Sequence, residues 1–416
     1  MHFEQISKVT ESIKSLSQKQ IFKHGFRLSV ANAISMVLNF FSGALIAATL
    51  GPYARGLYQS WKILTSIYSD ISNFALSAFI SSKFKLQTST FKGIGTHLSL
   101  VYVFAACLIP LMVKLNFTIA MIIVFFLLIP VGIYTDIYWG LLIRNEKYLV
   151  VTSWSFLAAG GSSLLTIVLF FTQLLTLDNV IISNSVIFML CLILGLRNAN
   201  FPQGNRSIYT NYRKILPIYF SNVFKTIFLF LDQMIVLYFL NLADLGIFAM
   251  ALAVAGVSSI ITSPVATLSP LIAKKRDNQK IKFIFQTLIC YLALLLLTVT
   301  LCYNFLGTIV IKTIGANFLP IVEIVPILFA GKLLQSFVQF LISWSVYRNE
   351  SKILMIEKVL NAMGLAVACA VFMSAKSLET AAWISFISLC PSCVYFLMLS
   401  FIEMWRPKIR YNKDGR

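Results

Sequence analysis

The chain has 416 residues, of which 58% are hydrophobic and 12% are charged, and its mean hydropathy is +0.84. A soluble domain has about 45–50% apolar and about 25% charged residues, so the composition excludes a soluble globular protein. The formal net charge of +19 would also suit a nucleic-acid-binding protein. The basic residues gather in alternate gaps between apolar stretches, as they do in the cytoplasmic loops of membrane proteins. We therefore expect no nucleic-acid partner.

The N-terminal segment 1–25 lacks the apolar core and the cleavage site of a secretory signal. Apolar residues recur there at helical spacing among lysines, namely Ile6, Val9, Ile13 and Leu16. The pattern favours an amphipathic helix on the anionic cytoplasmic face of a membrane. A disordered basic tail is the alternative.

Twelve apolar stretches follow. A helix needs about 20 apolar residues to cross the hydrocarbon core, and in lipid it satisfies its own backbone polar groups. The predicted transmembrane helices are 26–49, 56–80, 97–114, 117–143, 149–172, 176–196, 214–239, 244–272, 283–307, 320–346, 352–374 and 377–403.

The basic residues alternate with these spans. Counting the span edges with their gaps, 26 of the 34 Lys and Arg residues lie before the first span or after an even-numbered one. Only Arg55, Lys114, Lys312 and Lys376 lie in or beside the other gaps. Cytoplasmic loops retain Lys and Arg. We therefore expect both termini in the cytoplasm.

The chain divides into two halves of six spans. We expect an amphipathic segment 1–25, a first lobe 26–196, a cytoplasmic linker 197–213, a second lobe 214–403 and a basic tail 404–416. Leu50, Gly56 and Tyr58 lie between spans one and two, and Leu240, Gly246 and Phe248 lie with the same mutual spacing between spans seven and eight. Such parallel repeats are typical of transporters that bind substrate between their halves.

Ionisable residues inside the spans are functional candidates, because burying a charge in lipid is costly. They are Lys62 and Asp70 in span two, Asp136 in span four, Lys225 and Asp232 in span seven, Lys332 in span ten, and Glu357 with Lys358 in span eleven. Lys62 and Asp232 have similar predicted depths, so they could pair across the halves. Structural ion pairs and snorkelling lysines are the alternatives, and we assign Glu357 and Lys358 to snorkelling.

Catalytic motifs are missing from the sequence. It has no glycine-rich phosphate loop, no His–Cys metal cluster and no nucleophile elbow, and only three His. Cys390 and Cys393 match a C-x-x-C spacing, but they lie in an apolar span and are better interpreted as packing residues. We expect no enzyme, no catalytic residue, no metal and no cofactor.

Three segments resemble those of a known superfamily. Residues 50–58, LGPYARGLY, resemble its LGP-x-x-x-G-x-Y signature, residues 231–251 resemble its span seven, and residues 314–320, IGANFLP, resemble its G-x-x-F-x-P segment. The superfamily is that of the multidrug/oligosaccharidyl-lipid/polysaccharide exporters, and the Wzx-type O-antigen flippases are most similar in length and span number. The peptidoglycan-precursor flippases usually have two further spans.

This resemblance implies an all-α membrane protein with two pseudo-symmetric six-helix lobes around a central cavity. It also implies transport of an undecaprenyl-diphosphate-linked oligosaccharide across the bacterial inner membrane, coupled to a proton or sodium gradient. The expected partners are membrane lipids and the polysaccharide polymerase with its chain-length machinery. Candidate residues are Lys62, Lys225 and Lys332 for the diphosphate, Tyr58, Trp61 and Tyr68 for the sugars, and Asp70, Asp136 and Asp232 for ion coupling.

Two other interpretations remain. A multidrug antiporter of the same superfamily would favour an acidic site for cationic drugs. A membrane glycosyltransferase or polysaccharide polymerase would need large periplasmic loops, and the alternate gaps here are short.

Overall fold

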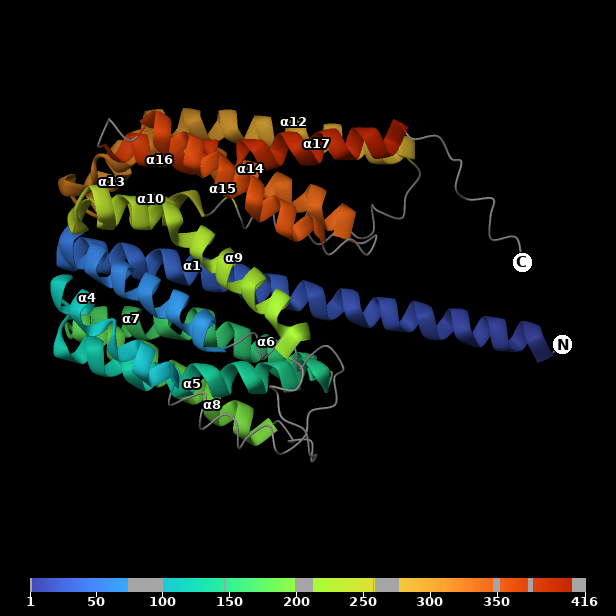
Figure 1. The fold of residues 1–416 in the computed structure, drawn as a ribbon, viewed down its shortest axis with the longest axis horizontal. Helices are drawn as coiled ribbons and strands as arrows, with labels where there is room; N and C mark the ends of the chain where they lie inside the picture. Colours follow the sequence, from blue (N-terminus) through green and yellow to red (C-terminus); the bar gives the residue numbers. More distant parts are fainter. Residues whose placement is uncertain are drawn as a thin grey trace. The chain divides into compact units, whose positions relative to one another are not determined.

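The computed structural model describes residues 2–73, 100–145, 147–198, 212–256, 258, 277–346, 352–372 and 377–405. Every element within these ranges is a helix (Figure 1), which confirms the predicted all-α class. The chain forms two compact units, Met1–Thr226 and Ile227–Arg416. They are called the N-terminal and C-terminal units below.

The N-terminal unit is built around two long contacts. Helix α5 packs along α8, and α1 packs against α5, α6 and α7. The helices are α1 (His2–Asn73), α4 (Ile109–Lys114), α5 (Ile119–Arg144), α6 (Tyr148–Phe156), the π-helix η1 (Leu157–Gly161), α7 (Ser162–Phe171), α8 (Leu177–Asn198) and the first part of α9 (Tyr212–Phe239).

The C-terminal unit is organised around α14, which contacts α10, α12, α15, α16 and α17. Besides the second part of α9, its helices are α10 (Leu242–Ala255), α12 (Asp277–Leu301), the π-helix η3 (Cys302–Leu306), α13 (Gly307–Thr313), the 3₁₀-helix η4 (Ala316–Phe318), α14 (Ile321–Val346), α15 (Lys352–Phe372), α16 (Leu378–Ile387) and α17 (Cys390–Trp405).

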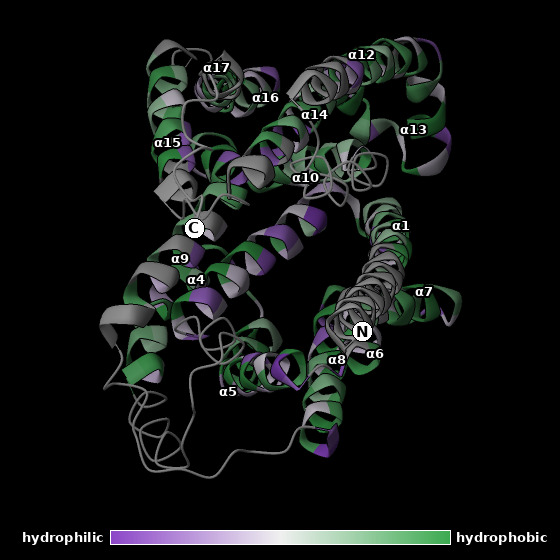
Figure 2. Cartoon of the chain, turned by 90° about the vertical axis from the view of Figure 1, so that its right-hand side faces the viewer, coloured by the Kyte–Doolittle hydropathy of each residue, from purple (hydrophilic) through white to green (hydrophobic). Residues whose placement is uncertain are grey.

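Each of the twelve predicted spans includes helical residues within the described ranges. Seven described helices are long and apolar enough to cross a membrane, and the first of them, Ala33–Asn73, overlaps two predicted spans. Large apolar side chains are exposed on the helices, such as Phe171 at 78% and Tyr238 at 81%. Hydrophobic residues predominate along the described helices (Figure 2). Such surfaces suit lipid, so the chain is a multi-pass membrane protein.

Helix also occurs in gaps that the sequence predicted between spans. The gap 308–319 holds most of α13 and all of η4, and the gap between the first two spans is a second case. Residues 50–55 were predicted as a gap between spans, but α1 is helical through them except at Gly51, where φ is 78° and ψ is 178°. Only glycine adopts this conformation at low cost. Pro52 follows at the start of the next helical segment, where a missing N–H is tolerated. A single residue therefore makes the bend.

Three predictions of organisation stay predictions. Residues 2–25 are helical and continuous with the first span, but no membrane is present to test their surface location. Most of the linker 197–213 lies outside the described residues. The cavity expected between the lobes is likewise untested.

Glycine allows close helix packing at several points. The sequence predicts such packing at Gly160 and Gly161, and a methyl group on Gly161 would lie 2.9 Å from Ile187 Cδ1. In the C-terminal unit a methyl group on Gly364 would lie 2.7 Å from the Ser388 carbonyl oxygen and 2.9 Å from Pro391 Cγ. Helices α15 and α17 are therefore in near-backbone contact.

Candidate functional sites: a polar cluster in each unit

Asp232 is the centre of a polar cluster in the C-terminal unit. Ser385 Oγ on α16 donates a 3.2 Å hydrogen bond to Asp232 Oδ2, and the backbone N–H of Gln233 donates a 2.8 Å bond to Oδ1. Lys332 on α14 interacts electrostatically with the same carboxyl group. Three helices thus bring a carboxyl, a hydroxyl and an ammonium group together, and we call these four residues the Asp232 cluster.

The geometry of Lys332 leaves its ammonium group with further hydrogen-bonding capacity. Lys332 Nζ donates a 3.3 Å bond to Gln335 Oε1 one turn along α14. An ammonium group has three donors. The cluster could therefore pass a proton, hold a small cation at the carboxyl, or present a positive charge to an anionic group.

A second buried acid in this unit was misinterpreted at the sequence level. We assigned Glu357 to snorkelling, but its side chain is only 3% exposed and accepts a 3.0 Å hydrogen bond from Gln339 Nε2. Ser392 Oγ also donates to the Glu357 carbonyl oxygen, at 3.2 Å. Glu357 thus ties α14, α15 and α17 together. Consecutive residues on a helix lie on different faces, and the sequence alone did not place Glu357 on the inner one. The side chain of Lys358 is outside the described set.

The predicted charged residues of the N-terminal unit lie in different surroundings. Lys62 on α1 is exposed, and Asp136 on α5 is half-buried. Asp70 on α1 accepts a hydrogen bond from Thr226 Oγ1 on α9. Asp70 thus joins the first part of α9 to α1, next to the position of Lys225.

Two predicted sugar-stacking residues use their polar atoms within the unit. Trp61 is 3% exposed, and its indole N–H donates a 3.1 Å bond to the Met121 carbonyl oxygen. Tyr68 is 6% exposed and donates to the Val101 carbonyl oxygen. Both rings fasten α1 to neighbouring helices. Tyr58 is half-buried, and its ring stacks on Trp61 at 6.5 Å between centroids.

Two predictions fall outside what the structure describes. Lys225 lies on α9, but its side chain is outside the described set. The proposed pairing of Lys62 with Asp232 would join the two units and stays a prediction.

Arg55 is a site residue that the sequence analysis missed. We treated it as an ordinary loop residue, but it lies in α1 after the bend and is 7% exposed. Its guanidinium carbon lies 5.5 Å from the centroid of the Tyr58 ring. Asn184 Nδ2 on α8 donates a 3.4 Å bond to the Tyr58 hydroxyl. We call Arg55, Tyr58, Asn184 and the adjoining Gly43 the Arg55 cluster.

The Arg55 side chain points along the first segment of α1 instead of outward to water. A methyl group on Gly43, which lies before the bend, would be 3.2 Å from Arg55 Nη2. One turn earlier, Asn39 Oδ1 accepts a 2.6 Å bond from Ser163 on α7. Ser163 follows η1, and such π-helical turns are frequent at functional sites. A polar strip therefore runs down the inside of the N-terminal unit.

The strip could have been found from the internal repeat. When Leu50 is aligned with Leu240, Arg55 corresponds to Leu245, which is fully buried in α10. The second half thus fills the same position with an apolar side chain. The signal that we overlooked is that one half of the repeat has a charged residue, Arg55, where the other half has an apolar one, Leu245.

Comparison with known proteins identifies the fold. No family model matches the chain, and no curated protein matches it in sequence. Among solved structures, the chain is similar to the lipid II flippase MurJ in an inward closed conformation, with 13% identity, coverage of 91% of this chain and 89% of that one, and a TM-score of 0.61. It is also similar to an inward-facing multidrug resistance MATE family transporter of the MOP superfamily, with 11% identity, coverage of 89% and 94%, and a TM-score of 0.64.

A third structure agrees with these two. A point mutant of the Vibrio cholerae MATE transporter VcmN has 12% identity, coverage of 93% of this chain and 96% of that one, and a TM-score of 0.61. The chain therefore has the MATE-like fold that the sequence predicted, over nearly its whole length.

Proposed function

We propose that this chain is a flippase for an undecaprenyl-diphosphate-linked oligosaccharide, such as an O-antigen repeat unit. It moves the lipid-linked sugar from the cytoplasmic to the periplasmic leaflet of the bacterial inner membrane by alternating access. The observation that carries the proposal is the fold, which it shares over 91% of its length with a lipid II flippase. The lysines that the sequence places inside the spans add a chemical reason for an anionic cargo.

Lysine side chains provide the charge that a diphosphate needs. Lys62 lies exposed on α1, and Lys332 lies half-buried on α14. Lys225 lies on α9, one residue before Thr226. An ammonium group binds phosphate as a compact point charge, and removing such a pair from water makes it stronger. We assign these three residues to the diphosphate during its passage.

Ion coupling is assigned to the Asp232 cluster. A carboxyl group with a hydroxyl donor and a nearby ammonium group changes its interactions when a proton or a sodium ion arrives. A transport cycle can use this change to favour one conformation over another. Asp70 and Asp136 remain secondary candidates.

The arrangement in the cell follows from the same proposal. Both termini are cytoplasmic, and the flipped unit is handed to the polymerase and its chain-length machinery in the periplasm. Reporter fusions in the linker 197–213 and at residue 376 should report cytoplasm and periplasm, respectively. The reverse result would contradict the orientation.

The central test is a single charge removal. Lys225→Ala should abolish display of the surface polysaccharide, because the diphosphate loses a counter-charge at membrane depth, while the amount of protein in the membrane stays normal. Lys312→Ala is the matched control, since Lys312 is exposed on α13, and it should leave display unchanged. Wild-type display by Lys225→Ala would contradict the role of this lysine.

The substrate itself is identified by deletion. In a strain with a known surface glycan, loss of this protein should cause the lipid-linked repeat unit to accumulate on the cytoplasmic leaflet. An unchanged distribution of that lipid between the leaflets would contradict the proposed function.

Coupling is tested in vesicles. Asp232→Asn keeps the size of the side chain and its bond to Ser385 but removes the charge. Transport should lose most of its dependence on an imposed proton or sodium gradient. An unchanged gradient dependence would exclude Asp232 as the coupling group.

The second candidate function is a multidrug antiporter, since MATE transporters share the fold. It predicts that deletion increases sensitivity to cationic drugs and leaves surface glycans intact. The flippase proposal predicts the opposite pair of results.

A further inference from the structure

Arg55 presents an unusual combination of charge and burial. Its side chain is only 7% exposed, and its Nε has no hydrogen-bond partner. No carboxylate of the described residues forms an ion pair with its guanidinium group. Burying a cation without an opposite charge destabilises a protein, and the contact with the Tyr58 ring at 5.5 Å replaces that charge only in part. A bound anion would supply the opposite charge that the described residues lack.

The fold does not require a cation at this position. The corresponding residue of the internal repeat is Leu245, whose exposure is 0%. An apolar side chain therefore satisfies the same place in a helix that follows the same kind of turn. The charge of Arg55 is an addition to the common architecture of the two units.

The surroundings of Arg55 suit an anion that carries oxygen atoms. The guanidinium group has five N–H donors in a planar fork and binds phosphate through two parallel bonds. The Tyr58 ring beside it, at 5.5 Å, orients the fork. Asn184 Nδ2 on the adjacent side donates to the Tyr58 hydroxyl and to the Val180 carbonyl oxygen. The Tyr58 hydroxyl, which accepts from Asn184, keeps its own O–H for an anion.

Glycine at position 43 keeps room for this fork. A methyl group there would lie 3.2 Å from Nη2 and 3.6 Å from Cζ of Arg55. The contact is tighter than ordinary van der Waals packing, so a methyl group at position 43 would require the guanidinium group to shift by a few tenths of an ångström.

From this geometry we propose that the Arg55 cluster is a phosphate-binding site in the N-terminal unit, separate from the lysines assigned above. It contacts the diphosphate of the lipid-linked cargo near the end of the unit where α1 bends. Helix α4 ends at the same end of this unit (Figure 1), which is the periplasmic end in the proposed orientation. This inference rests on the proposed function, because the cargo supplies the phosphate.

Binding by the purified full-length protein tests the site. Farnesyl diphosphate is the probe for a lipid-linked diphosphate, and phosphatidylglycerol is the probe for an ordinary lipid headgroup. The measurement is the apparent Tm in detergent as a function of probe concentration. Arg55→Leu carries the residue of the other repeat, and Arg55→Lys keeps the charge but loses the fork.

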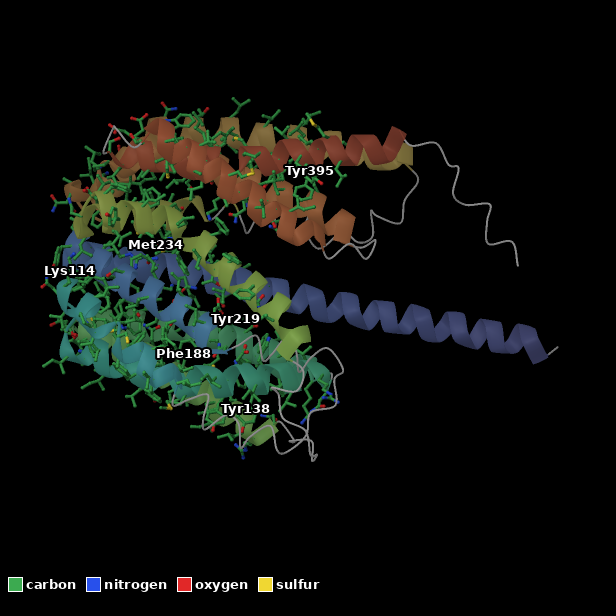
Figure 3. The ribbon with its side chains drawn as sticks, in the orientation of Figure 1. Lys114, Tyr138, Phe188, Tyr219, Met234 and Tyr395 are labelled. Atoms are coloured by element: carbon green, nitrogen blue, oxygen red, sulfur yellow. The ribbon has the colours of Figure 1, made fainter. Side chains whose placement is uncertain are left out.

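Lys114→Gln is the matched control. Lys114 is an exposed cation at the end of α4 in the same unit (Figure 3), so its loss changes the net charge equally. We expect farnesyl diphosphate to need about tenfold or more higher concentration for half-maximal stabilisation of both Arg55 variants. Arg55→Leu loses the charge-assisted bonds, and Arg55→Lys loses their two-point geometry. The control should match the wild type. Without probe, Arg55→Leu should have a higher apparent Tm than the wild type.

Three results would overturn the inference. Equal half-saturation in all variants, or no stabilisation of the wild type by farnesyl diphosphate, removes the Arg55 site while leaving the Lys225 and deletion tests of the flippase untouched. Stabilisation that depends on Arg55 but occurs only with phosphatidylglycerol would assign the site to a headgroup and contradict the cargo assignment. A lower apparent Tm for Arg55→Leu together with wild-type probe binding would show a structural role.

Discussion

The two units contain the same turn built in two ways. In the N-terminal unit, α1 bends at Gly51 with φ at 78° and continues as a helix. At the corresponding position of the repeat in the C-terminal unit, α9 has ended and Asn241 caps α10 through its side chain. The first helical residue after the turn is Pro52 in one unit and Leu242 in the other.

The interiors behind these turns differ in the same way. The position one turn further along is Arg55 in the first unit and the fully buried Leu245 in the second. In the C-terminal unit the charged candidates lie away from the turn in sequence, at Asp232 on α9, Lys332 on α14 and Glu357 on α15. The comparison teaches that buried polar groups occupy different places in the two units. This agrees with the separate roles that we propose for the Arg55 cluster and the Asp232 cluster.

The largest expected effect comes from exchanging the buried charge. Leu245→Arg places an unpaired guanidinium group in a fully buried site, which costs several kcal/mol, so we expect no correctly folded protein by fluorescence-detected size-exclusion chromatography. Arg55→Leu should remain folded and monodisperse. Normal folding of Leu245→Arg would mean that the C-terminal unit can also hold a cation here, which would remove the contrast between the units.

A smaller effect is expected from filling the closest helix contact. Gly364→Ala puts a methyl group 2.7 Å from the Ser388 carbonyl oxygen, and overpacking of this kind costs about 1–3 kcal/mol. The apparent Tm should therefore fall clearly. Gly331→Ala is the control, because its nearest neighbour, the Phe386 Cα, would be 3.8 Å away. Equal Tm values for the two variants would contradict the close packing of α15 on α17.

The smallest effects distinguish the two turns. Gly51→Ala forces alanine into a conformation reserved for glycine, at a cost of about 1–3 kcal/mol. Asn241→Ala removes the side chain that accepts a 2.9 Å bond from the Asp244 N–H, which costs about 1 kcal/mol. Thermal denaturation should rank Gly51→Ala as the less stable variant. The opposite order would show that the cap in the second unit matters more than the bend in the first.

Most of the fold could be predicted because lipid imposes simple rules. The lengths of the apolar stretches indicated most of the helical segments now seen in the described residues, although most of α13 and all of η4 lie in a predicted gap. The short gap around Gly51 was misplaced, since a helix that bends at a single glycine and one that stops and restarts have nearly the same hydropathy. The alternation of basic gaps supported an orientation that stays a prediction.

The candidate sites were only partly predictable. Asp232 and Lys332 stood out as charges inside apolar spans, yet their proximity depends on how α9 and α14 rotate against each other. Trp61 and Tyr68 carry the right chemistry for sugars, but their polar atoms bind backbone carbonyl oxygens within the unit. Sequence position gives the depth of a residue along a helix axis and leaves the face it occupies open.

The sequence by itself determined that this is an all-α membrane protein, because the length of each apolar stretch is a property of the local sequence. That its two halves are related stays a prediction. Only the tertiary structure decided which charged side chains are buried and which residues contact them. Arg55 and Glu357 had been assigned to a loop and to a snorkelling surface, and both lie inside their units. The reason is that burial depends on the neighbouring helices, which the chain brings together from distant parts of its sequence.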